Sequence, residues 1–193
     1  MRNLVLMATV FAGMAAATAD DLDYTYVEAG YGQVEIDGLD EDGDALFIGG
    51  SFGFGENWMV FGEYSTSEFD AGGGAEVDFD QLVLGLGGHF PIATSVDFVG
   101  KLGYVDVSAD VSTPFGSASV DDSGYLLSGG VRALVAQRFE LEGALEYVDI
   151  GDSDDTGISL SGLYHFNDLF SLGARFATSD DADEIGVFAR LTF

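Results

Sequence analysis

The chain has 193 residues, enough for one domain with a sizeable core, and carries 34 acidic against six basic side chains, a formal net charge of −28. This balance argues against a nucleic-acid partner, because phosphate binding requires a basic surface. No cysteine is present, which excludes disulfides and thiol chemistry. The 28 glycines, two prolines and abundant Phe and Tyr favour many close-packed strands over disorder.

The first 19 residues have the three regions of a secretory signal peptide. Arg2 supplies the positive charge, residues 4–13 are apolar, and Ala17-Thr18-Ala19 matches the small-residue cleavage pattern. The apolar run is too short for a membrane-spanning helix, and acidic residues follow it at once. We therefore expect residues 1–19 to be removed and residues 20–193 to form one exported domain.

Ten later segments alternate apolar and polar side chains with the period of two that strands have. The clearest runs from Arg138 to Ile150, where Phe139 and Leu141 alternate with Glu140 and Glu142. Taken alone it also fits an amphipathic helix, and the nine other segments decide for strands. The predicted strands are residues 24–36, 45–54, 58–67, 77–90, 96–111, 120–135, 138–150, 156–166, 169–178 and 184–193.

The connections between these strands alternate in length. Residues 55–57, 91–95, 136–137 and 167–168 are short connections, whereas residues 37–44, 68–76, 112–119, 151–155 and 179–183 are longer and mostly acidic. Short turns at one end and long loops at the other are typical of an antiparallel up-and-down transmembrane barrel, with the loops outside the cell. A closed barrel is also the one way across a bilayer without helices.

One face of the strands is apolar, and the other carries charges that would be prohibitive in the core of a soluble barrel. We therefore expect the apolar face to meet lipid and the charged face to line the lumen. The predicted lumen charges are Glu28, Glu63, Asp97, Lys101, Arg132, Glu140, Glu142, Glu146, Arg175 and Arg190. A structural polar core is favoured over a selectivity filter, because about eight strands enclose a space that side chains can fill.

A specific pairing is predicted for Arg132. The turn at Ala136-Gln137 joins its strand to the next one as a hairpin. Pairing outward from this turn places Arg132 level with Glu140 and Glu142, so we expect it to bond one of these carboxylates inside the barrel.

The alternation inverts near the long loops. Beyond Tyr104, Val105 and Val107 fall on the lumen side and Asp106 falls outward, which indicates strands that continue from lipid into water. Aromatic side chains mark both ends of the lipid-facing stretch, as interfacial girdles do. The predicted girdle residues are Tyr31, Tyr64, Tyr104, Tyr125 and Tyr147 at one end, and Phe54, Trp58, Phe90, Phe139, Phe166 and Phe170 at the other.

The signal sequence, the alternating strands and a last strand IGVFARLTF ending in Phe193 resemble the small outer-membrane β-barrel proteins. This group includes the OmpA transmembrane domain, OmpX-like proteins and many "porin family" sequences. The resemblance implies that Phe193 belongs to the signal read by the barrel-assembly machinery, and that outer-membrane lipid and lipopolysaccharide surround the protein. Most relatives of this size have eight strands, so eight remains the alternative to ten.

No catalytic residue, cofactor or metal-ligand set is predicted. His89 and His165 each precede a short turn, the wrong end for lipid-modifying chemistry at the outer rim, so they are interpreted as buried or girdle residues. The segment LDEDGDA at residues 39–45 departs from the EF-hand spacing. The acidic loops predict a solvated surface, with bridging divalent cations as the alternative.

The sequence thus predicts an integral outer-membrane barrel with a structural, passive-permeation or surface-interaction role and no catalysis. A small cation-preferring pore is the alternative, because acidic side chains line both the lumen and the loops. A lipid-modifying outer-membrane enzyme is a remote alternative.

Overall fold

The computed structural model describes residues 22–36, 42–70, 75–180 and 182–193. The predicted signal peptide lies outside the described residues, and so do residues 37–41 of the first acidic loop. No helix in the described ranges is long and apolar enough to cross a membrane.

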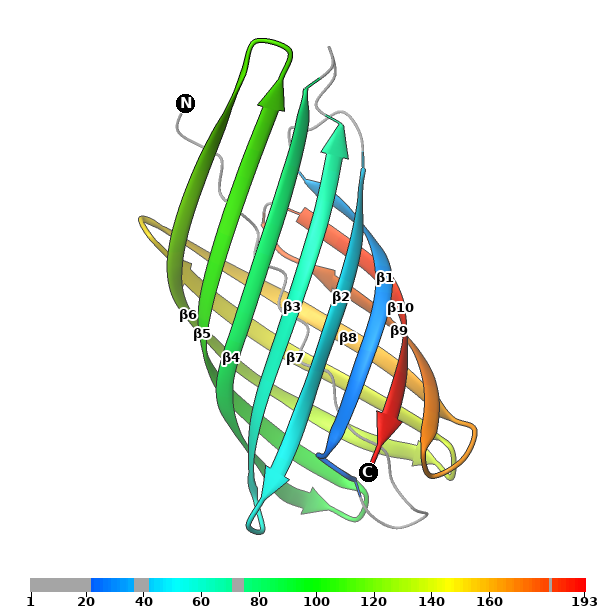
Figure 1. Cartoon of the computed structure of the whole chain (residues 1–193). Coiled ribbons are helices and arrows are strands. Elements are labelled where there is room, and N and C mark those ends of the chain that lie inside the picture. Colours follow the sequence, from blue (N-terminus) through cyan, green and yellow to red (C-terminus); the bar gives the residue numbers. More distant parts are fainter. Residues whose placement is uncertain (1–21, 37–41, 71–74, 181) are drawn as a thin grey trace.

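The described residues form a closed barrel of ten antiparallel strands (Figure 1). Each strand pairs with the next along the chain, and the last pairs with the first. The prediction of ten strands is confirmed, and the eight-strand alternative is wrong. The strands are β1 (Tyr26–Ile36), β2 (Gly43–Phe54), β3 (Trp58–Asp70), β4 (Glu76–Ala93), β5 (Val96–Thr113), β6 (Gly116–Ala136), β7 (Phe139–Ile150), β8 (Ser153–His165), β9 (Phe170–Thr178) and β10 (Ala182–Thr192).

The two ends of the barrel differ. We call one the turn end: it holds the β2–β3, β4–β5, β6–β7 and β8–β9 connections and the C-terminus. The opposite end, which holds the other five connections, is called the loop end. At the turn end, Phe193 continues the closing seam, because its backbone N–H donates to the Thr25 carbonyl at 3.1 Å.

The seam between β1 and β10 runs without interruption from Tyr26 opposite Thr192 to Ile36 opposite Ala182. Gly30 lies in the middle of this seam. A Cβ there would collide with the Phe47 ring and the Val187 carbonyl. Glycine at this position therefore lets a phenyl ring lie flat against the inner wall of the barrel.

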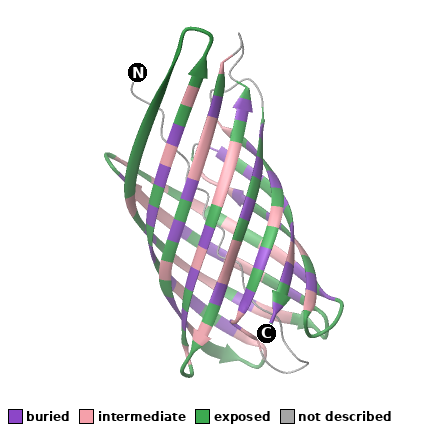
Figure 2. Ribbon diagram, in the orientation of Figure 1, coloured by how far each residue is buried: buried purple, intermediate pink, exposed green. Residues whose placement is uncertain are grey.

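Burial alternates along the strands, as Figure 2 shows by colour. Leu145 is 62% exposed, whereas its neighbours Ala144 and Glu146 are buried. The exposed set is mainly apolar and the buried set holds most of the charges of the strands, which is the arrangement of a barrel whose outer wall meets lipid.

Two predicted loops are much shorter in the structure. Residues 112–119 were expected as a loop, but β5 continues to Thr113 and β6 starts at Gly116. Residues 151–155 likewise shrink to Gly151-Asp152, where Gly151 adopts a φ of 61° that favours glycine. The β5–β6 hairpin projects beyond the rest of the loop end (Figure 1). Residues 116–123 are exposed on both faces, so water removes the alternation by which strands are recognised.

Candidate functional site: the charged lumen

The interior near the turn end is built around Arg132, a side chain that is completely buried. Its Nε donates to Glu140 Oε1 at 2.8 Å, which confirms the predicted pairing across the β6–β7 hairpin. By register Arg132 lies opposite Glu142, and the bond instead runs diagonally toward the turn end. Removing either partner of such a buried pair would leave an uncompensated charge away from water.

The first described residues fold back into this end of the lumen. Arg132 Nη1 donates to the Asp23 carbonyl at 3.0 Å, and its guanidinium lies 4.6 Å from the centroid of the Tyr24 ring. On its other side, Tyr24 stacks on His89 with ring centroids 3.8 Å apart, and its hydroxyl donates to Asp97 at 2.7 Å. Backbone and aromatic side chains therefore fill the lumen at this level.

A second arginine, Arg190, completes this layer from the seam. Its Nε donates to Glu28 Oε2 at 2.7 Å, and its guanidinium lies 4.2 Å from the centroid of Tyr26. Nη1 also approaches Glu140 Oε1 at 3.9 Å. The carboxylate of Glu140 thus lies between two guanidinium groups, and one connected network reaches from β1 and β10 to β6 and β7.

Further charges cross the lumen above this layer. Lys101 on β5 lies 3.6 Å from Glu142 on β7, although β6 separates the two strands in the sheet. Glu146 accepts a hydrogen bond from the Ser159 hydroxyl at 3.0 Å. The first contact connects strands that are not neighbours, and the second joins the neighbouring strands β7 and β8.

Closer to the loop end, Arg175 lies between two carboxylates. It donates to Glu184 Oε1 through Nε at 3.2 Å and Nη2 at 2.9 Å, and Nη1 reaches Glu63 at 3.5 Å. The Phe47 ring, kept in place opposite Gly30, lies under the guanidinium with 3.2 Å between Cζ and the ring centroid. Planar stacking of this kind suits arginine better than lysine.

The structure places all ten predicted lumen charges on the inner wall, and it brings most of them together in ion pairs. Asp97 is an exception, because its contacts are with Tyr24 and His89 and not with a lysine or arginine side chain.

The predicted girdle tyrosines lie on the outer wall, where each donates to an aspartate that is level with it or closer to the loop end. Tyr64 bonds Asp80 at 2.6 Å and Tyr104 bonds Asp106 at 3.0 Å. The pairs Tyr31–Asp44, Tyr125–Asp149 and Tyr147–Asp149 repeat the motif. The six aromatic residues predicted at the other end are also exposed or half-exposed on the outer wall. An interfacial role for both sets remains a prediction.

Four participants were not assigned from the sequence. Tyr24 begins the predicted strand 24–36 and Tyr26 shares the lumen face with Glu28, but the sequence indicates no partner for either. Glu184 follows an acidic run that resembles a loop. Ser171 shares the lumen-facing parity of Arg175, but the sequence indicates no partner for it. The strict alternation along β10 indicates that Glu184 faces the lumen, because it lies on the same face of the strand as Arg190.

Ser171, His165 and Glu140 form a grouping with the composition of a hydrolase triad. His165 Nδ1 and Ser171 Oγ are 2.7 Å apart, and His165 Nε2 lies 3.3 Å from Glu140. All three side chains are buried, and Ser171 is 0% exposed. A nucleophile needs access to its substrate, so this grouping has the geometry of a structural network.

Both histidines are thus buried or partly buried beside the lumen charges, as one of the two sequence interpretations expected. Within the described ranges, no group of three or more His, Cys, Asp or Glu side chains could hold a metal ion. Of the predicted acidic segment at residues 39–45, residues 39–41 lie outside the described part, and Asp44 faces outward toward Tyr31.

This geometry defines a class: a transmembrane β-barrel with an apolar outer wall and a polar, side-chain-filled interior. Residues 4–166 match the family model of the outer membrane protein beta-barrel domain, which is more than half of the chain. The protein belongs to this family and is a barrel of the bacterial outer membrane.

Three solved structures illustrate the similarity. The attachment invasion locus protein Ail of Yersinia pestis, in complex with the heparin analogue sucrose octasulfate, is 20% identical, with a TM-score of 0.50 over 86% of this chain and 97% of that chain. Neisserial surface protein A is 11% identical, with a TM-score of 0.50 over 89% and 98%. The translocator domain of the autotransporter NalP from Neisseria meningitidis is 12% identical, with a TM-score of 0.52 over 89% of each chain. Identities this low show the fold alone, and none of the curated proteins matches the chain.

Proposed function

We propose that this protein is a closed outer-membrane barrel without catalytic activity, whose working surface is its acidic loop end at the outside of the cell. The signal peptide directs it through the periplasm, and the C-terminal strand with Phe193 presents it to the barrel-assembly machinery. In this orientation the turn end faces the periplasm, as the short connections and the C-terminus require.

The burial of the lumen charges supports a closed barrel. Arg132 is 0% exposed and Arg190 only 2%, with Glu140 between them. Charges that line a water-filled pore would be wet, whereas these are covered by Tyr24, Tyr26 and the backbone of residue 23. An ion crossing this layer would have to break buried ion pairs, which is costly.

Planar-bilayer recordings test the closed lumen. After insertion of the refolded protein, verified by heat-modifiable migration on a gel, we expect no conductance steps. The double variant Arg132→Ser with Arg190→Ser removes the two largest side chains of the layer and serves as a positive control, which should show steps. Steps from the wild type with a reversal potential that favours K⁺ over Cl⁻ would instead support the cation-preferring pore.

We propose that lipopolysaccharide surrounds the outer wall at the level of the tyrosine–aspartate pairs. These aspartates face outward where the headgroup phosphates of the outer leaflet lie, so direct contact would be repulsive. Divalent cations shared between a protein carboxylate and a lipid phosphate would remove this repulsion, although the described side chains offer no complete metal site of their own.

The absence of catalysis is supported by the inaccessibility of Ser171. Overexpression in a host with defined lipid A should leave the mass spectrum of that lipid unchanged. A new acylated or deacylated species that disappears in Ser171→Ala would contradict the proposal.

A further inference from the structure

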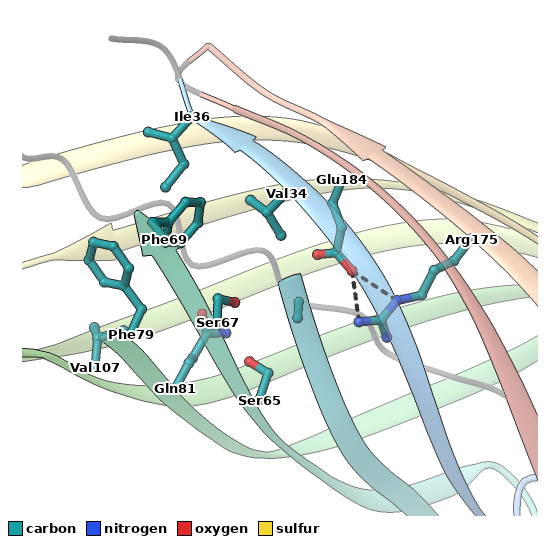
Figure 3. A pocket seen from close by; sticks show the side chains of 11 residues that line it. Val34, Ile36, Ser65, Ser67, Phe69, Phe79, Gln81, Val107, Arg175 and Glu184 are labelled. Atoms are coloured by element: carbon teal, nitrogen blue, oxygen red, sulfur yellow. Dashed lines mark hydrogen bonds and ion pairs between the residues drawn. The ribbon is translucent and has the colours of Figure 1, made fainter. Parts of the chain in front are cut away.

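A small cavity lies inside the barrel near the loop end, above the Arg175 layer (Figure 3). Its volume is about 40 Å³, and it is lined by residues of β1 to β5, β9 and β10. A single water needs roughly 10–15 Å³ by this measure, and a cavity that binds benzene has about 150 Å³. The space therefore suits a group of a few atoms and excludes an aromatic ring.

The wall of the cavity is apolar. Phe69 and Phe79 meet edge to face with centroids 5.5 Å apart, and Val34, Ile36 and Val107 continue the wall. The Phe69 side chain is almost fully buried, with 3% of its surface exposed. Such a wall favours an alkyl stem, and phenyl faces also attract organic cations.

The floor of the cavity is polar and incompletely paired. Gln81 is 7% exposed and lines the cavity, yet its amide bonds none of the described residues. The hydroxyls of Ser65 and Ser67 beside it are also free of such bonds. The amide atoms of Gln81 are not among the fully enclosed unpaired atoms, so the amide can bond a ligand that enters the cavity.

The charge of the floor indicates the sign of the ligand. Arg175 is already engaged by Glu184 and Glu63, and the bonds to Glu184 use Oε1, which leaves Oε2 outside these contacts (Figure 3). The Glu184 carboxylate only accepts, and the oxygens of Gln81, Ser65 and Ser67 can accept as well, so a ligand that donates finds an acceptor on each of them. An anion would meet Glu184 instead.

We propose that this cavity is a binding site for a small organic cation, a primary ammonium on a short unbranched alkyl stem. The ammonium donates to the oxygens of Gln81, Glu184 and the serines, and the stem lies against Phe69 and Phe79. The inference goes beyond the proposed function and stands whether or not the barrel conducts.

The test is an NMR titration of the full barrel in zwitterionic lipid nanodiscs, following the side-chain amide of Gln81. Propylammonium, 1-propanol and propionate share one stem and differ in the charge of the head group. We expect saturable shifts with propylammonium, at least tenfold weaker binding of 1-propanol and no binding of propionate. Equal shifts with all three compounds, or none with propylammonium, would overturn the proposal.

Two variants and one control locate the site. Gln81→Leu removes the amide at nearly constant size and should weaken propylammonium binding about tenfold, the range for a hydrogen bond to a charged group. Glu184→Gln should weaken it at least as much. Asp183→Asn removes the same charge from the adjacent, outward-facing residue and should leave affinity unchanged. Backbone amides of Val34 and Ser65 report binding in the variants, and heat-modifiable migration verifies their folding.

The same ammonium could reach the cavity as a free amine or as a lysine side chain. Nα-acetyl-lysine methylamide presents it on a peptide-like backbone. Affinity equal to or above that of propylammonium assigns the site to a lysine of a partner, and tenfold lower affinity assigns it to free amines. If the wild type and Gln81→Leu bound each of the two compounds with equal affinity, the proposed site would be refuted.

Discussion

Each of the three buried arginines is held twice, by a carboxylate and by the face of an aromatic ring. Arg132 bonds Glu140 and covers Tyr24, and Arg190 and Arg175 repeat the arrangement with other partners. The carboxylate neutralises the charge, while the ring covers the flat side of the guanidinium that cannot form hydrogen bonds.

Replacing Arg132 by Met tests this arrangement. The substitution keeps the bulk but leaves Glu140 with a weaker set of partners in a space closed to water, so we expect a loss of about 3 kcal/mol in the free energy of unfolding. The urea midpoint of the refolded barrel measures it. Arg138→Met, on the exposed turn, removes the same charge and should leave the midpoint unchanged. A loss below roughly 1 kcal/mol for Arg132→Met would mean that the lumen is wet.

The seam between β1 and β10, which closes the barrel, has no room for a side chain at Gly30. Gly30→Val would drive two methyl groups into the Phe47 ring and the Val187 carbonyl, so we expect a loss of at least 1–3 kcal/mol or failure to fold. Ala29→Val places the same side chain one residue away on the exposed wall and should fold normally. Heat-modifiable migration on a gel compares the two, and equal behaviour would mean that Phe47 can move aside.

The β5–β6 hairpin beyond the rim should be dispensable. Residues 112–117 bury little, so replacing them by Asn-Gly, which suits a two-residue hairpin, should leave the urea midpoint unchanged. Replacing residues 149–154 in the same way removes Ile150, which packs with Phe61 and Val105 in the lumen, and should lower the midpoint. Equal losses from both deletions would show that the projecting hairpin supports the barrel.

The sequence was sufficient to predict the number of strands and the face of each, because lipid outside and charge inside impose a strict period of two. It failed where water covers both faces and alternation disappears, as at residues 116–119, which were expected as a loop. That Arg132 bonds either Glu140 or Glu142 followed from the hairpin turn, and the structure shows the bond to Glu140. Contacts across the lumen, such as Lys101 with Glu142, depend on how far the closed barrel is sheared, which no local pattern reveals.

For the molecule as a whole, the formal net charge of −28 is distributed unequally between the lumen and the outer surface. Four of the six basic residues are used inside the lumen, so the loop end and the outer rim are almost purely acidic. Their mutual repulsion opposes folding and is screened by salt, with a Debye length of about 10 Å at 0.1 M. The urea midpoint in detergent should therefore rise between 20 and about 200 mM NaCl.

The response to magnesium should depend on lipid. In detergent, MgCl₂ at matched ionic strength should act no more strongly than NaCl, because the described side chains form no metal site. In vesicles that contain lipopolysaccharide, we expect Mg²⁺ to raise the midpoint further, since the ion can then join an outward aspartate such as Asp80 or Asp106 to a lipid phosphate. The double variant Asp80→Asn with Asp106→Asn should lose part of this increment and keep its response to NaCl. An excess effect of Mg²⁺ already in detergent would instead indicate a metal site made by the protein alone.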